Sequence, residues 1–300
     1  MSGRSVEVLR AGALTTVQDG GRPGLAHLGV PPSGALDQAA LALGNRLLGN
    51  PVDAAALETT LDGVSLRPDG DCVIVVTGAP AAVSVNGRPV AWGAAVEVPA
   101  GARLEVGPAS AGLRSYVSLA GGVCVEEVLG SRSHDVLSGL GPTPLRDGDQ
   151  LPLGAAPDLR PPAVDVAPHP APPGELALTL WDGPRRDRLA DEGAAALRSA
   201  TWTVASASNR IGLRLEGPAL TLASREELRS EGLVTGAVQV PPDGRPVIFL
   251  RDHPTTGGYP VIGVIDPSEL SACAQARPGT PVRFHPRRER WVSHAARTGV

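Results

Sequence analysis

A short segment near the C-terminal end combines several groups that could take part in chemistry. Residues 251–261 read RDHPTTGGYPV. The hydroxyls of Thr255 and Thr256 and the backbone amides of Gly257 and Gly258 would form a neutral set of hydrogen-bond donors. Donors of this kind stabilise negative charge that develops on a substrate oxygen. The segment therefore favours a loop that binds and activates a polar small molecule.

Three further residues of this segment add acid–base and aromatic groups. Asp252 and His253 could transfer protons, and Tyr259 offers a face for stacking. Glycines that follow a strand also occur at plain β-bulges, and threonines favour strands in any case. The segment alone therefore leaves a purely structural interpretation open.

A second polar loop lies near the N-terminus, at residues 16–34, and reads TVQDGGRPGLAHLGVPPSG. Its glycines and prolines could bring a carboxylate, a guanidinium and an imidazole together without long side chains. The structural alternative is that Asp19 only pairs with Arg22 and braces the turn. We favour a binding loop, whose polar residues are Gln18, Asp19, Arg22, His27 and Ser33.

A third polar loop, residues 120–135, reads AGGVCVEEVLGSRSHD. Arg132 beside the Ser131 hydroxyl and nearby glycine amides suits a carboxylate or a phosphate. His134 and Asp135 resemble an acid–base pair, but neighbouring side chains on an extended chain point to opposite faces. We therefore expect anion binding from Ser131 and Arg132 and no pairing of His134 with Asp135.

The composition excludes several mechanisms. All 27 basic residues are arginines, so a lysine Schiff base, a lysine general base and a P-loop are ruled out, as is covalent biotin on this chain. The formal net charge of -4 gives no electrostatic footprint for nucleic acid. The HExxH, GxSxG and GxGxxG motifs are also absent, and the pattern predicts no metal site.

The cysteines and the apolar runs indicate the compartment. The three cysteines form no CxxC pair, and no segment reaches about 18 uncharged apolar residues. We expect a cytoplasmic protein without a membrane span or signal peptide. Cys72 and Cys124 lie in apolar strand patterns and are expected in the core, and Cys273 is expected to serve packing.

A proline-rich stretch divides the chain. Residues 155–174 contain seven prolines and predict an extended linker between a lobe at 1–154 and a lobe at 175–300. Closely spaced short strands predict a mainly β protein, either barrel or sandwich. Asn86-Gly87 between two apolar runs predicts a type I′ hairpin.

Only a few helices are expected. The segment 33–51 has Leu36, Ala40, Leu43 and Leu47 on one face and ends at Gly49. Two short helices are expected within 185–205 and 266–279.

Several segments together resemble a known family over about residues 5–285. They are TVQDGGRPGLAHLGVPPSGALDQAALALGNRLLGNPVDAAALE, AGGVCVEEVLGSRS, SNRIGLRLEGPAL, SEGLVTGAVQVPPDGRPVIFL and TTGGYP. In this order they are similar to the biotin-dependent carboxyltransferase and allophanate hydrolase subunit 2 family. The resemblance implies two cyclophilin-like β-barrel lobes.

The resemblance also implies partners and a reaction. Family members act with a KipI-like subunit 1 and, in 5-oxoprolinase, with a LamB/YcsF-type subunit. That complex opens 5-oxoproline, a cyclic amide, with ATP, whereas the equivalent part of urea carboxylase transfers a carboxyl group from biotin to urea. A KipA-like member instead binds a KipI-like kinase inhibitor. We expect the 5-oxoprolinase type, with carboxyl transfer from a separate biotin carrier and regulation as alternatives.

The same resemblance implies roles for the polar loops. The TTGG segment would bind the amide oxygen, Arg22 or Arg132 a substrate carboxylate, and His27 or Asp252 would transfer a proton. Asp19, Arg22 and His27 would line one side of a cleft, and the other side would be formed by Thr255, Thr256, Gly257, Gly258 and Tyr259.

The chain departs from the family pattern at two positions beside the TTGG segment. Pro254 and Val261 stand where the family usually has glutamine and lysine. The valine removes a cation that could bind a carboxylate or polarise a carbonyl, which weakens the carboxyltransferase alternative most.

Overall fold

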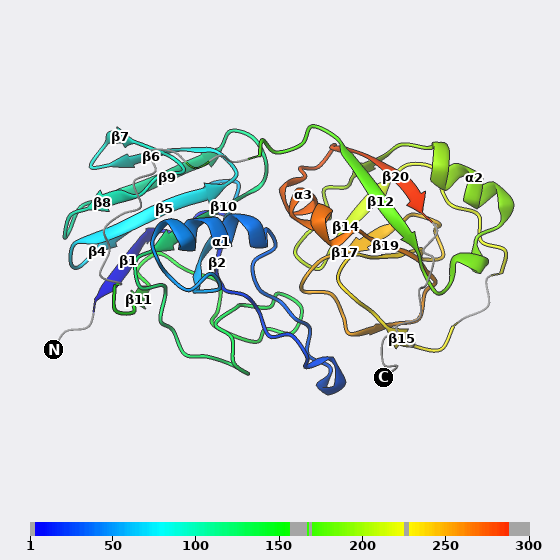
Figure 1. Ribbon diagram of the computed structural model, residues 1–300, viewed down its shortest axis with the longest axis horizontal. Coiled ribbons are helices and arrows are strands. Elements are labelled where there is room, and N and C mark those ends of the chain that lie inside the picture. The colour runs from blue at the N-terminus through cyan, green and yellow to red at the C-terminus, as the bar shows by residue number, and fades with distance from the viewer. Residues whose placement is uncertain (1–3, 157–166, 168–169, 225–227, 288–300) are drawn as a thin grey trace, which may run out of the picture.

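The computed structural model describes residues 4–156, 167, 170–224 and 228–287, and it contains two β-rich lobes that lie next to each other (Figure 1). Each lobe has its own apolar core. Most of the stretch 155–174 lies outside the described residues, so the predicted linker and the lobe boundaries at 154 and 175 stay predictions.

The first lobe consists of two antiparallel sheets that share one core. Their strand orders are β11-β1-β4-β9-β6-β7 and β2-β3-β10-β5-β8. Alternating side chains of both sheets, such as Val8, Leu57, Leu66 and Val117, point into the same core. The strands are β1 Ser5–Arg10, β2 Leu14–Gln18, β3 Ala56–Thr60, β4 Val64–Pro68, β5 Cys72–Gly78, β6 Ala81–Val85, β7 Arg88–Val90, β8 Val96–Val98, β9 Leu104–Ala109, β10 Arg114–Leu119 and β11 Gln150–Pro152.

Helix α1 (Gln38–Leu47) packs on β5 and β10 of the first lobe. Asp37 begins it as a cap, because its Oδ1 accepts a hydrogen bond from the Ala40 amide at 3.0 Å. Gly49, at φ +66°, ends it as predicted. The predicted apolar face was wrong at Leu36, which precedes the cap and packs into the core of the second lobe instead.

The described part of the second lobe contains a closed seven-stranded barrel of order β12-β19-β16-β17-β14-β13-β20. Parallel pairing of β20 with β12 closes the ring. Trp202 and Phe284 fill its core, with ring centroids 5.4 Å apart. The strands are β12 Leu176–Asp182, β13 Trp202–Val204, β14 Gly212–Glu216, β16 Ala237–Gln239, β17 Val247–Phe249, β19 Val261–Ile265 and β20 Pro281–Arg287.

Smaller elements surround the barrel and the loops. Two short strands, β15 (Glu231–Gly232) and β18 (Thr256–Gly257), pair with each other outside the barrel. The helices are α2 Asp191–Ser199 and α3 Leu270–Gln275, and the 3-10 turns are η1 Ala26–Leu28, η2 Arg186–Arg188 and η3 Pro267–Glu269. No helix within the described ranges is long and apolar enough to cross a bilayer.

The expectation of a mainly β chain is confirmed, and so is the hairpin at Asn86-Gly87. These two residues have φ of +50° and +75° and join β6 to β7 with Val85 opposite Arg88. A closed hydrogen-bonded barrel occurs in the second lobe, while the strands of the first lobe form a sandwich of two sheets. The placement of Cys124 in the core was wrong. It lies in a loop after β10 and is exposed, whereas Cys72 and Cys273 are buried.

Candidate active site

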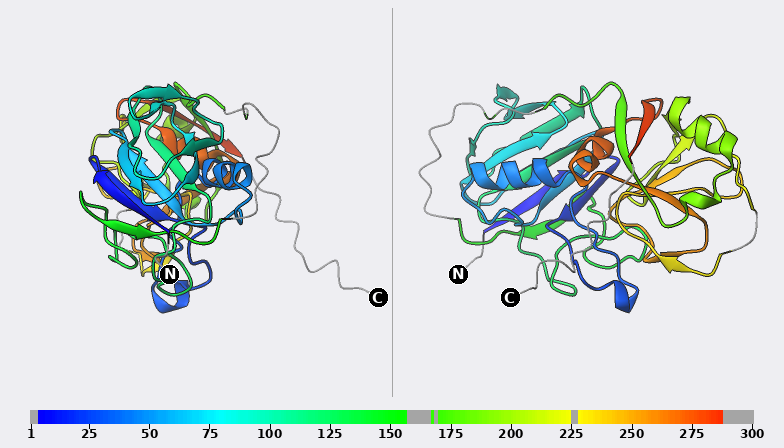
Figure 2. Two further views of the ribbon diagram at one scale, coloured as in Figure 1. Left: turned by 90° about the vertical axis from the view of Figure 1, so that its left-hand side faces the viewer. Right: turned by 45° about the vertical axis from the view of Figure 1, so that its right-hand side comes forward.

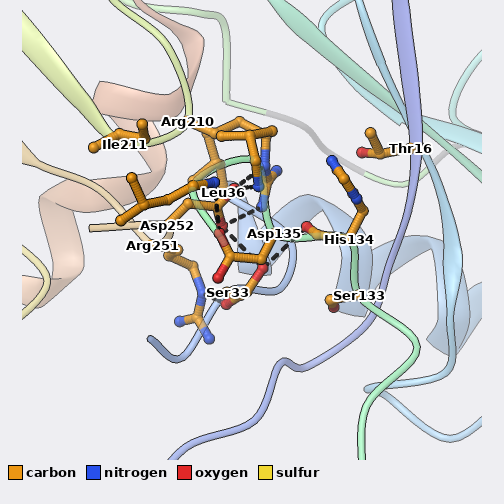
Figure 3. Close-up of polar contacts among 12 residues, drawn as sticks. Thr16, Ser33, Leu36, Ser133, His134, Asp135, Arg210, Ile211, Arg251 and Asp252 are labelled. Atoms are coloured by element: carbon orange, nitrogen blue, oxygen red, sulfur yellow. Dashed lines mark hydrogen bonds and ion pairs between the residues drawn. The ribbon is translucent and has the colours of Figure 1, made fainter. Parts of the chain in front are cut away.

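The three polar loops predicted from the sequence meet where the two lobes touch (Figure 3). The central contact joins Arg210, at the entrance to β14, and Asp252, at the start of the loop that precedes β18. Arg210 Nε donates to Asp252 Oδ2 at 2.8 Å, and Arg210 Nη2 donates to Asp252 Oδ1 at 3.1 Å. Both side chains are buried. A bidentate pair of this kind fixes orientation as well as distance.

Arg210 also binds the first lobe. Its Nη1 donates to Glu58 Oε1, and its Nη2 donates to the Gly34 carbonyl at 2.7 Å. Burial alone would lower the pKa of Arg210, but the carboxylates of Asp252 and Glu58 raise it above its ordinary value. The guanidinium is therefore a permanent cation that connects a strand of the first lobe with two loops.

Asp252 has a further contact with each of the other two loops. Ser33 Oγ donates to its Oδ1 at 2.9 Å, and the Val136 amide donates to its Oδ2 at 3.0 Å. The side chain is fully buried. Both oxygens are thus occupied by donors from Arg210 and from the two loops of the first lobe, and these contacts favour an anchoring role over the proton transfer that the resemblance suggested.

The buried polar network continues across the lobe interface beyond Glu58. Tyr116 Oη donates to Glu58 Oε2 at 2.7 Å and accepts from the Asp37 amide at 2.8 Å. Burial raises the pKa of Tyr116, and the nearby carboxylates of Glu58 and Asp37 raise it further. Gln275 of α3 donates to Asp37 Oδ2 at 2.9 Å. Buried polar groups need partners, and here the two lobes supply them to each other.

Asp19 joins the N-terminal polar loop, residues 16–34, to the loop after β10. Its Oδ1 accepts from Ser131 Oγ at 2.6 Å and from Ser133 Oγ at 2.5 Å, and its Oδ2 accepts from the Arg132 amide at 2.6 Å. The Gly21 amide also donates to Oδ1 at 2.7 Å. Asp19 and Ser131 are buried. Their polar atoms are therefore used inside the protein to hold two loops together.

Arg22 and Gln18 are buried as well. Arg22 donates through Nε to the Val128 carbonyl at 3.2 Å and through Nη2 to the Ser133 carbonyl at 2.5 Å. Burial lowers the pKa of Arg22, whereas Asp19 acts to raise it. Gln18 Nε2 donates to the His134 carbonyl at 2.9 Å. Both side chains therefore hold the segment 128–134 by hydrogen bonds from the protein interior.

Arg132 and His27 are the predicted residues of these two loops that reach solvent. Arg132 is partly exposed and forms an ion pair with Glu127 at 2.7 Å through Nη1. His27 lies exposed on η1, where its Nδ1 is 3.1 Å from the Gly24 carbonyl. In Figure 1 the blue turn η1 projects from the same side of the molecule as β15. In the right-hand view of Figure 2 the blue turn η1 again projects from the lower side of the molecule.

The TTGG segment is also accessible. Thr256 is exposed and Thr255 is half-buried, and neither hydroxyl has a hydrogen-bond partner within the described residues. Gly257 passes close to Gln239, so that a Cβ added to this glycine would lie 2.8 Å from Gln239 Nε2. Gln239 in turn donates to the Tyr259 carbonyl at 2.9 Å. The segment therefore presents unused hydroxyl donors on a fixed backbone.

A cavity of about 410 Å³ opens beside this segment. Gly258, Tyr259 and Pro260 form part of its wall, and Tyr259 is 49% exposed. The volume lies within the range of small-molecule sites. The rest of the wall comes from the second lobe, at Arg188, Ala219, Leu220, Thr221, Leu222, Ser224, Leu228, Val240, Pro242, Asp243 and Gly244.

The two departures from the family pattern have local structural consequences. Val261 is buried in a small apolar cluster with Leu233, Ala237 and Phe249 at the first position of β19. The Pro254 carbonyl lies 2.8 Å from His253 Nδ1. Burial lowers the pKa of His253. His253 is thus turned into the protein and does not stand beside the exposed donors.

Two central residues of the site, Arg210 and Glu58, were missed by the reasoning from sequence. Arg210 lies in the segment SNRIG before β14 and Glu58 within β3, and neither belongs to the three polar loops singled out from the sequence. For Glu58 the available signal was a charged residue inside an apolar strand-like segment, because such a residue is rarely buried unless it is paired. Arg210 carries no such signal, since it follows the polar stretch SASN.

His134 and Asp135 behave as expected. No hydrogen bond joins the two side chains within the part of the chain that the structure describes. Asp135 instead accepts from Ser138 Oγ at 2.7 Å. The pair therefore does not form an acid–base unit.

Comparison with known proteins agrees with this architecture. The C subunit of 5-oxoprolinase from Escherichia coli (strain K12) is 36% identical over 289 residues, which cover 93% of this chain and 90% of that protein. The protein of the same name from Haemophilus influenzae is 34% identical over 288 residues with the same coverage.

The crystal structure of the K. lactis urea amidolyase matches with a TM-score of 0.88 at 33% identity. This match covers 94% of the present chain but 18% of the urea amidolyase chain, so the fold forms a small part of that larger protein. The model of the carboxyltransferase domain, subdomains A and B, matches residues 28–286. The chain therefore belongs to the carboxyltransferase domain family of subdomains A and B.

Proposed function

We propose that the chain is subunit 2, the C-type subunit, of an ATP-dependent amidohydrolase complex of the 5-oxoprolinase type, and that it acts with a KipI-like subunit 1. One observation carries the proposal. The match to the C subunit of 5-oxoprolinase extends over about nine-tenths of both chains, whereas the match to urea amidolyase takes up less than a fifth of that protein. The chain thus corresponds to nearly the whole of a 5-oxoprolinase subunit but to a small region of urea amidolyase.

The exposed TTGG segment supplies the chemistry for this function. A cyclic amide in the cavity would contact Gly258 and Tyr259, which form part of its wall. In the proposed binding mode its carbonyl oxygen extends from the cavity toward Thr255 and Thr256, whose hydroxyls have no partner within the described residues. When a nucleophile adds to the amide carbon, the C=O double bond opens and negative charge moves onto that oxygen. Fixed donors stabilise this charge more strongly than they stabilise the neutral amide, and this difference lowers the barrier.

The remaining roles follow from exposure. Arg132 is partly exposed and Arg22 is buried, so Arg132 is the better candidate for a substrate carboxylate. His27 is exposed and Asp252 is enclosed by Arg210, Ser33 and Val136, so His27 is the better candidate for proton transfer. We assign Asp252 and Asp19 to positioning of the loops.

The complex also requires groups that this chain does not provide. In this proposal the assembled complex uses ATP, and a LamB/YcsF-type protein is its third subunit. A chain without lysine has no attachment point for biotin, so any biotin must come from a separate carrier. The proposed setting is the cytoplasm.

Reconstitution tests the proposal. The chain is co-expressed with the KipI-like and LamB/YcsF-type proteins of the same genome, and ATP hydrolysis is measured with and without 5-oxoproline. We expect hydrolysis that depends on 5-oxoproline and falls at least tenfold in Thr256→Ala and in His27→Ala. Thr201→Ala, an exposed threonine outside the loops, serves as the control. Full activity in both loop variants would mean that the site is placed wrongly.

Carboxyl transfer is a second candidate, because the structural match to urea amidolyase is as extensive on this chain as the sequence match to the 5-oxoprolinase protein of E. coli. It predicts urea-dependent turnover with a biotinylated carrier and none with 5-oxoproline. A complex with the KipI-like protein that turns over neither substrate would point to the KipA-like regulatory role.

A further inference from the structure

A tight turn in the loop after β10 displays a leucine in an unfavourable backbone conformation. Val128 and Ser131 form a β-bridge, with the Val128 amide 2.8 Å from the Ser131 carbonyl. Between them Leu129 and Gly130 have φ of +53° and +75°, as in a type I′ turn. Leucine is disfavoured at positive φ. Leu129 is nevertheless 49% exposed at the tip of this turn.

The turn itself does not require a leucine. The same chain makes the same kind of turn at Asn86-Gly87, with φ of +50° and +75°, and uses asparagine at the first position. Asparagine tolerates this conformation far better. An apolar side chain that adds strain and gains no burial is a candidate for contacts outside its own chain. Leu61 shares both properties, so the position of Leu129 among other exposed apolar side chains has to distinguish it.

Buried polar residues hold the turn rigid. Ser131 Oγ and the Arg132 amide donate to Asp19, and Arg22 Nε donates to the Val128 carbonyl on the other arm of the turn. Both arms are therefore fixed from the interior by side chains that are themselves buried. A rigid support lets an exposed side chain bind without losing conformational entropy.

Other exposed apolar side chains gather on the same loops. Of seven large apolar side chains that are exposed within the described residues, Leu28 lies on η1, Leu129 and Leu137 lie in or next to the loop after β10, and Tyr259 follows β18. Val234 follows β15, which pairs with β18. We call these five residues the loop face. In Figure 1 its segments lie along the lower side of the molecule. Apolar groups concentrated on one side are typical of interaction sites.

The relatives give a reason for a partner of different sequence. Two of them are named as the C subunit of 5-oxoprolinase, a name that belongs to one chain of a complex with other subunits. The occupant of the loop face that we infer is therefore a different subunit. Seated there, it would cover the exposed Thr256 and Tyr259.

We propose that Leu129 is an apolar anchor of the surface by which this chain docks onto its partner subunit, inserting into an apolar socket of that subunit beside the TTGG segment. The inference rests on the proposed function, which requires a second subunit, and adds to it the surface and the residue that hold that subunit. Anchors of this type carry a large share of the binding energy of an interface.

The test compares variants that change the side chain but not the turn. Leu129→Asn reproduces the Asn-Gly turn already present at 86–87, and Leu129→Met keeps an apolar anchor. Leu61→Asn is the matched control, because Leu61 also has a positive φ, of +62°, and is 41% exposed, but lies in the turn between β3 and β4. Affinity for the purified KipI-like protein of the same genome is measured by calorimetry, and the melting temperature of each variant by scanning calorimetry.

We expect Leu129→Asn to bind the KipI-like protein at least tenfold more weakly while its melting temperature stays equal or rises. Leu129→Met and Leu61→Asn should bind within about threefold of the parent chain. Equal affinity of Leu129→Asn and the parent would overturn the docking role and leave the proposed function standing, provided that the complex still hydrolyses ATP with 5-oxoproline.

Two further outcomes would also decide the matter. If the parent chain itself neither binds nor supports turnover, the proposed function fails and the docking role fails with it. If sedimentation shows that the parent self-associates and Leu129→Asn does not, the occupant is a second copy and the assignment to a partner subunit is wrong.

Discussion

Arg210 and Asp252 form a bidentate ion pair at the boundary of the two lobes, with contacts of 2.8 and 3.1 Å and both side chains buried. Through this pair the strand that carries Glu58, the loop that carries Ser33 and the loop that precedes β18 are held at one point. The exposed TTGG segment begins three residues after Asp252. The geometry of the candidate site is therefore set by a contact that substrate does not reach.

Removal of one partner of this pair should destabilise the protein strongly. Asp252→Ala leaves the buried charge of Arg210 without its bidentate partner, and such changes cost about 3–5 kcal/mol. Asp266→Ala is the control, because Asp266 caps η3 near the surface and its loss should cost about 1 kcal/mol. The free energy of unfolding in urea measures both. A loss for Asp252→Ala no larger than that of the control would show that the ion pair does not hold the lobes together.

The two glycines of the TTGG segment should differ in their tolerance of a methyl group. In Gly257→Ala the new Cβ would lie 2.8 Å from Gln239 Nε2 and 3.0 Å from Leu233 Cδ1, so Gln239 must move and release the Tyr259 carbonyl. In Gly258→Ala the nearest atom is the Leu228 carbonyl at 3.4 Å. We expect kcat/KM of the reconstituted complex to fall about tenfold for Gly257→Ala, because small misplacements reduce rates steeply. Equal kcat/KM for the two variants would contradict this account.

Two buried histidines should make stability depend on pH. Burial lowers the pKa of His134 and of His253 below the ordinary value of 6.5. As pH falls through the ordinary value, the unfolded chain takes up protons that the folded chain does not, so stability present at pH 7 is lost toward pH 5. The free energy of unfolding should therefore fall over this range, and less so in His134→Gln and in His253→Gln. His27→Gln, at an exposed position, should keep the slope of the parent chain; if it flattened the slope as much as the other two, burial would not be the cause.

The cysteines should react according to their burial. Cys124 is exposed, whereas Cys72 and Cys273 are buried, and burial raises the pKa of Cys273 to about 12. Since the thiolate is the reactive form, the native protein should react rapidly at one thiol with an aromatic disulfide reagent and at three in denaturant. Cys124→Ser should remove the rapid reaction. Rapid labelling of Cys273 would show that α3 opens readily.

Local chemistry allowed much of the fold to be predicted. The Asn86-Gly87 turn, the glycine that ends α1 and the strands of both lobes were predictable, because turn preference and alternation of apolar residues act over a few positions. The start of α1 was less clear, since Leu36 continues its apolar pattern although Asp37 caps the helix.

The family, the mainly β fold and the three loops of the candidate site could be predicted from the amino-acid sequence, because long ordered motifs and short-range patterns carry that information. Which residues of these loops face inward became clear from the three-dimensional arrangement alone. Asp19, Arg22 and Asp252 look like surface binding residues in the sequence, yet they are buried, because Ser131, Val128 and Arg210 supply partners from about 40 to 110 positions away. Whether a polar side chain is buried depends on whether distant residues satisfy its hydrogen bonds, and spacing along the chain does not contain that information.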